Sequence, residues 1–232
     1  MPAALTELIH ENQRGVTAWS KAFAATVPSG YTVVVGVFGW RSATNWDPAA
    51  GHCTDDKGGS YSLLTSIGSG NPGMGLWVRH NVTDAPQTIT VTPSWGGGSG
   101  QTTGFAAILE PIAASADPKD TFSTADLLWS ATQQPGSATP TQADAYAFVG
   151  ITSSTDDFSA LTQPSGYTAI NLQATSGTTQ DGGWAYKALT STSAENPIWT
   201  VTNVGTGRND LVIGIVKTAA AAGSTTYLLV AN

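Results

Sequence analysis

The fold is decided by an apolar run near the start of the chain, Tyr31-Thr32-Val33-Val34-Val35-Gly36-Val37. β-Branched and aromatic residues favour strands, because their side chains pack well on a pleated surface. A second run of the same kind lies past the middle of the chain, Ala145-Tyr146-Ala147-Phe148-Val149-Gly150-Ile151. We therefore predict a buried strand at each position.

Four further segments follow each run in the same order, which indicates an internal repeat. In the first half they are Gly59–Leu63, Gly75–Arg79, Thr88–Thr92 and Phe105–Glu110. In the second half they are Ser165–Ala169, Gly183–Lys187, Ile198–Thr202 and Leu211–Val216. One matching pair would mean little, since strands resemble each other by composition, but five segments in one order indicate related halves.

The repeat predicts an all-β protein, a β-sandwich of about ten strands with an internal pseudo-twofold repeat. We expect the sandwich at residues 31–217, with its two halves at 31–111 and 143–217 and a crossing connection at residues 111–142. Two tandem sandwiches are the alternative, although about five strands would give each a thin core. In either case we expect four strand residues to be buried, namely Trp77, Val91, Trp184 and Val201.

The composition excludes several classes of function. Charged residues make up 11% of the chain, against about 25% in typical soluble domains, and the net charge is −7. We expect no nucleic-acid partner, because the nine Lys and Arg residues are scattered. No apolar run approaches the roughly 20 residues that span a membrane, so we expect no membrane partner. No secretory signal is visible at the start, so we expect synthesis in a cytoplasm.

The densest group of potential ligands is the segment His52-Cys53-Thr54-Asp55-Asp56-Lys57-Gly58-Gly59. It lacks the alternating acidic positions of a calcium loop and the further soft ligands that zinc needs. We therefore interpret it as a turn with solvated aspartates, and Cys53 as a small buried residue. We expect no catalytic residues, no metal and no cofactor, because no nucleophile motif or pair of carboxylates stands out.

Three tryptophans, Trp40, Trp46 and Trp95, lie in loops rich in Gly, Ser, Thr and Asn. Exposed rings among small polar residues can stack on the apolar face of a sugar, so these three are candidate glycan or partner contacts. The alternative is that they cover the open end of the sandwich or lie in a subunit contact.

The two ends of the chain lie outside the repeat and are candidate assembly arms. Residues 1–30 carry apolar side chains, among them Leu5, Leu8 and Ile9, without clear turn signals. We expect Val16–Phe23 to add as an edge strand and Met1–Gln13 to contact a neighbouring subunit. The C-terminal tail, residues 218–232, is the second arm, with a further strand expected at Thr225–Val230.

The run Thr54-Asp55-Asp56-Lys57-Gly58-Gly59-Ser60-Tyr61-Ser62-Leu63 resembles a pattern of jelly-roll domains in bacterial and phage surface proteins. It has Gly59 where Asn is usual, and Ser29-Gly30-Tyr31 stands where Gly-Asp usually precedes the first strand. The resemblance covers roughly residues 28–113 and, more loosely, 143–217.

This resemblance implies a non-enzymatic structural component of a tailed-bacteriophage virion, such as a minor tail protein or a head-decoration protein. Its partners would be other virion proteins and further copies of itself, and it would be located in the virion. The alternative is a carbohydrate-binding module or adhesin domain that uses loop aromatics to bind a host-surface glycan. A hydrolase domain is a third interpretation.

Overall fold

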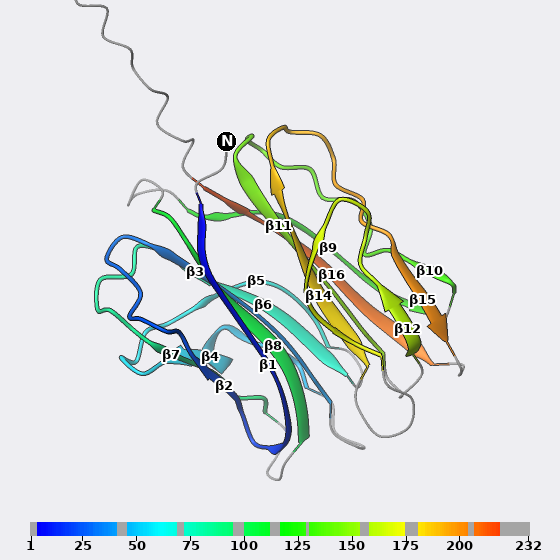
Figure 1. The fold of residues 1–232 in the computed structure, drawn as a ribbon, viewed down its shortest axis with the longest axis horizontal. Helices are drawn as coiled ribbons and strands as arrows, with labels where there is room; N and C mark the ends of the chain where they lie inside the picture. The colour runs from blue at the N-terminus through cyan, green and yellow to red at the C-terminus, as the bar shows by residue number, and fades with distance from the viewer. Residues whose placement is uncertain are drawn as a thin grey trace, which may run out of the picture.

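The chain folds into four antiparallel β-sheets arranged in a sandwich-like manner (Figure 1). The computed structural model describes residues 4–40, 46–68, 72–94, 100–111, 117–128, 130–153, 158–174, 181–203 and 207–218. Within these ranges the only helical element is a 3-10 turn at Ala50–His52. The predicted all-β sandwich is therefore confirmed.

The first half forms a five-stranded sheet in the order β1-β8-β3-β6-β5 and a three-stranded sheet in the order β2-β7-β4. Its strands are β1 (Leu5–Val16), β2 (Trp19–Ala22), β3 (Thr32–Trp40), β4 (Cys53–Asp55), β5 (Ser62–Ile67), β6 (Gly73–Arg79), β7 (Thr88–Val91) and β8 (Gly100–Leu109).

The second half repeats this arrangement strand for strand, in the orders β9-β16-β11-β14-β13 and β10-β15-β12. Its strands are β9 (Lys119–Leu128), β10 (Thr132–Gln133), β11 (Ala145–Ser153), β12 (Phe158–Thr162), β13 (Thr168–Gln173), β14 (Gly182–Leu189), β15 (Trp199–Asn203) and β16 (Arg208–Lys217). Each half thus pairs its strands as a jelly roll does, except that the fifth strand joins the larger sheet.

Three apolar cores hold the sheets together. One lies between the two sheets of the first half, one between the two sheets of the second half, and one between the two five-stranded sheets. The central strand β3 contributes to two of them, because Val33 and Val35 point into the first-half core while Val34 and Phe38 point into the middle core. Burial on both faces explains why this strand is continuously apolar.

The middle core allows both sequence interpretations, one sandwich or two tandem sandwiches, to be compared with the structure. The two five-stranded sheets that pack across it supply ten strands, but these are not the expected ten, because β1 and β9 take part and β7 and β15 belong to the three-stranded sheets. The alternative also holds in part, since a three-stranded sheet gives each half a sandwich of its own. Trp77, Val91 and Trp184 are completely buried and Val201 is 2% exposed, so the four predicted core residues are confirmed.

The N-terminal segment differs from the expectation. The edge strand is Leu5–Val16, which pairs with β8 from Leu109 to Gly100, and it is not Val16–Phe23. Trp19–Ala22 instead pairs with β7 in the three-stranded sheet. Leu5 and Leu8 pack against the middle core and Ile9 against the first-half core, so these side chains find partners within their own chain. A contact of residues 1–13 with a neighbouring subunit stays a prediction.

The connection between the halves also differs from the expectation. Residues 111–142, expected to be a crossing connection, contain β9 and β10, the first two strands of the second half. The alternation in β9 was hard to detect from the sequence. Phe122 lies on the opposite face from Ala125 and Leu127, and all the remaining residues from Lys119 to Asp126 are polar. The strand expected at Thr225–Val230 lies outside the described residues.

Candidate functional site

The structure removes Trp46 from the candidate glycan contacts. Its side chain is completely buried, and its ring stacks on Trp77 with centroids 6.1 Å apart. Its indole N–H donates to Nδ1 of His52 over 3.1 Å. Burial lowers the pKa of His52, against the opposing charge of Asp47, so the imidazole remains a neutral acceptor at neutral pH. Trp46 is therefore a core residue of the first half.

The other candidates have different outcomes. Trp40 is the last residue of β3 and is half-buried. Trp95 lies outside the described residues. The structure therefore does not bring the three tryptophans together into a platform, and a glycan contact at Trp40 or Trp95 stays a prediction.

The acidic segment is not the solvated turn that we expected, because the Asp55 side chain is fully buried. Its carboxylate forms an ion pair with Arg79 and accepts hydrogen bonds from the Gly59 backbone N–H, at 2.9 Å, and from the Tyr61 hydroxyl, at 3.2 Å. A buried carboxylate is stable only when it is paired and hydrogen-bonded. Asp55 therefore organises the turn after β4. Cys53, next to it, is buried as predicted, and burial raises the pKa of its thiol.

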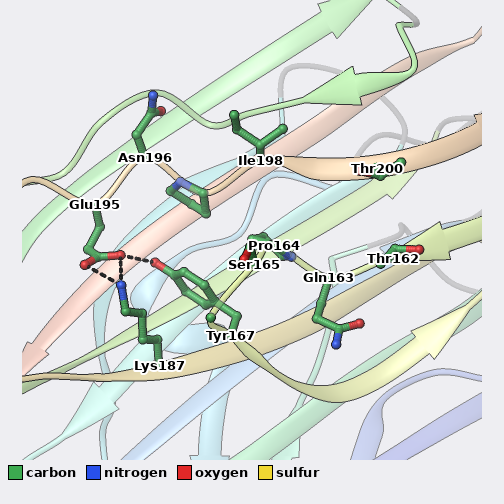
Figure 2. Close-up of a pocket in the computed structure, with 12 residues that line it drawn as sticks. Thr162, Gln163, Pro164, Ser165, Tyr167, Lys187, Glu195, Asn196, Ile198 and Thr200 are labelled. Atoms are coloured by element: carbon green, nitrogen blue, oxygen red, sulfur yellow. Dashed lines mark hydrogen bonds and ion pairs between the residues drawn. The ribbon is translucent and has the colours of Figure 1, made fainter.

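The second half carries a related cluster that borders an open groove (Figure 2). Tyr167 and Lys187 hold the register positions of Tyr61 and Arg79. The Tyr167 hydroxyl donates to Oε2 of Glu195 over 3.0 Å, and Lys187 Nζ lies 2.9 Å from both oxygens of that carboxylate. Burial and the Glu195 carboxylate raise the pKa of Tyr167, so its hydroxyl keeps the proton that it donates.

The groove has a volume of about 720 Å³, within the range of about 300–1,000 Å³ that is typical of ligand sites. One wall is the segment 162–167, which follows β12, and the other consists of residues 195–198 with Thr200. Figure 2 shows Tyr167, Lys187 and Glu195 at one end and Thr162 and Thr200 at the other.

The equivalent turns of the two halves differ next to this groove. In the first half, Oδ1 of Asp56 accepts hydrogen bonds from the backbone N–H groups of Gln87, at 2.8 Å, and Thr88, at 3.2 Å. This clasp joins the turn after β4 to the start of β7. In the second half, Pro197 and Ile198 stand at the positions of Gln87 and Thr88 in the repeat. Proline has no N–H to donate, so the same clasp cannot form.

Apolar exposure is also concentrated in the second half. Among the described residues, the large apolar side chains that are exposed are Phe122 (57%), Leu128 (69%) and Ile198 (48%). Leu128 and Ile198 border a second hollow of about 280 Å³, and Ile198 lines both hollows. The two halves share one topology, yet their surfaces differ.

The described part of the chain contains no group of three or more His, Cys, Asp or Glu side chains that could hold a metal ion. In the same residues, no helix is long and apolar enough to cross a membrane.

Comparisons with known proteins add little to this picture. No protein-family model matches the chain, and no curated protein matches it. A similar solved structure is a chain from the atomic structure of Sulfolobus Turreted Icosahedral Virus, with 12% sequence identity over 92% of this chain and 93% of that chain. The TM-score is 0.21, so this likeness supports no conclusion about fold or function.

One feature of the sequence, a repeated pentapeptide, marks the turn that borders the groove. The pentapeptide Pro-Ser-Gly-Tyr-Thr occurs at residues 28–32 and again at 164–168. Both copies form a turn with glycine at positive φ, +87° at Gly30 and +79° at Gly166, where a side chain would be strained. Only the second copy borders the groove, because it follows β12 directly.

Proposed function

We propose that the protein is a non-enzymatic structural component of a virion, acting as a minor tail or capsid-decoration protein of a tailed bacteriophage does. It would work by packing against other virion proteins and further copies of itself, and by displaying its outer surface. The observation that most supports this proposal is an edge strand, β9, that carries exposed apolar side chains. In the described part of the chain, residues 135–141 hydrogen-bond to this strand only at side chains near its start, Asp120, Thr121 and Ser123.

The exposed end of β9 is suited to pairing with another chain. It pairs with β16 without a register shift from Phe122, opposite Gly214, to Leu128, opposite Arg208. Its one ionisable residue in this stretch is Asp126, whose carboxylate oxygens each lie 2.6 Å from a guanidinium nitrogen of Arg208. Regular, weakly charged edge strands are usually avoided in monomeric proteins, because their free backbone groups pair with other chains.

The corresponding edge of the first half is protected. Strand β1 carries four ionisable side chains, Glu7, His10, Glu11 and Arg14, and its pairing with β8 is irregular at both ends. Charges and irregularities of this kind block edge-to-edge pairing. The contrast favours the second half as the contact half of the molecule.

Burial of the exposed side chains would add to the backbone pairing. Phe122 and Leu128 expose more than half of their surface, so covering each contributes about 1–2 kcal/mol. The low charge of the chain keeps the opposing desolvation cost small.

We expect the wild-type protein to self-associate with rising concentration and the double variant Phe122→Lys/Leu128→Lys to remain monomeric. Two lysines at the edge would repel the same lysines of a second copy. The variant would also lack the apolar side chains whose burial favours association. Sedimentation velocity over a concentration series measures both. Ala160→Lys is the control, since it adds a charge at an exposed position of β12, another edge strand. A wild-type protein that is monomeric throughout, or a double variant that associates normally, would contradict the proposal.

The virion assignment has its own test. Mass spectrometry of purified particles should detect the chain, and its gene should neighbour genes for capsid, portal or tape-measure proteins. Particles that lack the chain would rule out the virion role, even if self-association through β9 were found.

A further inference from the structure

We propose that the groove of the second half binds an uncharged carbohydrate. This inference goes beyond the structural role, because it concerns residues 162–167 and 195–200 and does not depend on the β9 edge.

The groove has fixed walls, which reduces the entropic cost of binding a ligand. Pro164 and Pro197 are buried, so their rings anchor the two walls to the body of the protein. The turn at Gly166 is closed by a hydrogen bond from Tyr167 N–H to the Pro164 carbonyl, 3.0 Å long. Glu195 is held by both Tyr167 and Lys187.

The charge of the groove favours a neutral ligand. Among the residues that line it, the charged side chains are Lys187 and Glu195. Each oxygen of the Glu195 carboxylate lies 2.9 Å from Lys187 Nζ, so the two charges compensate each other. No unbalanced cation is left to recognise a phosphate, sulfate or carboxylate group.

The remaining lining side chains can hydrogen-bond to hydroxyl groups. Gln163 and Asn196 lie on the two walls of the groove, their amides have no partner among the described residues, and each amide offers two donors and an acceptor. The hydroxyls of Thr162 and Thr200 stand at the far end (Figure 2). Ile198, which is 48% exposed, offers an apolar contact for the C–H groups of a sugar ring. Neutral donors and acceptors around one apolar side chain match the chemistry of a sugar.

A peptide ligand fits the same groove less well. An added peptide strand needs a free sheet edge. The edges of β12 and β15 that face each other at the groove are already paired, Thr162 opposite Thr200, and the unpaired edge of β12 lies on its other side. A proline-rich peptide needs exposed aromatic rings, and the one aromatic residue of the lining, Tyr167, is only 7% exposed.

Nuclear magnetic resonance on the full-length, ¹⁵N-labelled protein tests the proposal. The probes are three neutral disaccharides, maltose, lactose and N,N′-diacetylchitobiose, and an oligoproline peptide. We expect at least one sugar to shift the backbone amide signals of Gly166 and Asn196. In the double variant Gln163→Ala/Asn196→Ala the dissociation constant for that sugar should rise at least about tenfold, because two side-chain hydrogen bonds are lost.

Thr192→Ala is the matched control, because Thr192 is exposed on the same β14–β15 connection but does not line the groove. It should leave the dissociation constant unchanged, and all variants should keep the wild-type melting temperature. The proposal is overturned if no sugar shifts these amides, if the shifts persist in the double variant, or if oligoproline alone produces them. Sedimentation of the same variants reports separately on self-association through β9, so the two proposals can fail independently.

Discussion

Replacing Trp184 with alanine is expected to lower the free energy of unfolding by about 3–5 kcal/mol, the usual range for removing a buried aromatic side chain. Trp184 is completely buried in the middle core. Its ring stacks on Phe38, with centroids 6.2 Å apart, and meets the Phe105 ring edge-on at 5.2 Å. Both partners belong to the first half, so the substitution weakens the contact between the halves.

Urea denaturation of the purified variant measures this loss. Ile198→Ala is the control, because Ile198 is 48% exposed and its truncation should change the free energy of unfolding by no more than about 0.5 kcal/mol. A loss below about 1 kcal/mol for Trp184→Ala would mean that the middle core does not hold the two halves together.

The middle core was largely predictable, because the sequences of its strands themselves indicate that the strands are buried. A strand buried on both faces has to be apolar at every position, and the runs around Gly36 and Gly150 are. The two glycines have a packing role. A Cβ at Gly36 would come within 2.3 Å of the Phe105 ring, and one at Gly150 within 2.6 Å of the Trp184 ring. A glycine inside such a run marks the place where a neighbouring ring lies flat against the strand.

Loop residues were predicted less well, because their burial depends on contacts that are distant in sequence. Trp46 stands among polar residues, yet it is buried because its loop folds back onto Trp77. Asp55 was expected in water, yet Arg79, 24 positions later, stabilises it inside the protein. The composition of a loop does not indicate which distant residue the loop will contact. The alternation of apolar and polar residues in a strand, in contrast, indicates directly which side chains are buried.

The groove was missed for a related reason. The equivalent turns differ at this place. Asp56 accepts a hydrogen bond from the Gln87 N–H in the first half, whereas Pro197 stands at the position of Gln87 in the second. A repeat is recognised from the segments that recur in both halves, and these already match Tyr61 with Tyr167. The residues that distinguish the groove stand at positions where the halves differ.

We expect the protein to lose stability as the pH rises from about 4 to about 7, by about 4 kcal/mol through one carboxyl group. Burial and, to a lesser extent, the charge of Asp126, opposite it on β9, together raise the pKa of Asp210 from 3.8 to about 7 against the influence of Arg208. The folded state therefore holds a proton in this range that the unfolded chain has released. A group with a raised acidic pKa stabilises the fold below the unfolded pKa and loses that contribution as the pH approaches the folded pKa.

Asp210→Asn should remove this dependence, because asparagine resembles the protonated carboxyl group at every pH. Chemical denaturation of both proteins at about pH 5 and about pH 8 provides the measurement, and the wild-type protein should lose more stability between the two than the variant does. Asp126→Asn is an informative second variant. It removes the negative neighbour, so the pKa of Asp210 should fall and the loss should shrink. Parallel pH profiles for the wild type and Asp210→Asn would show that Asp210 is ionised in the folded protein, and hence that β9 and β16 accommodate two adjacent carboxylates without cost.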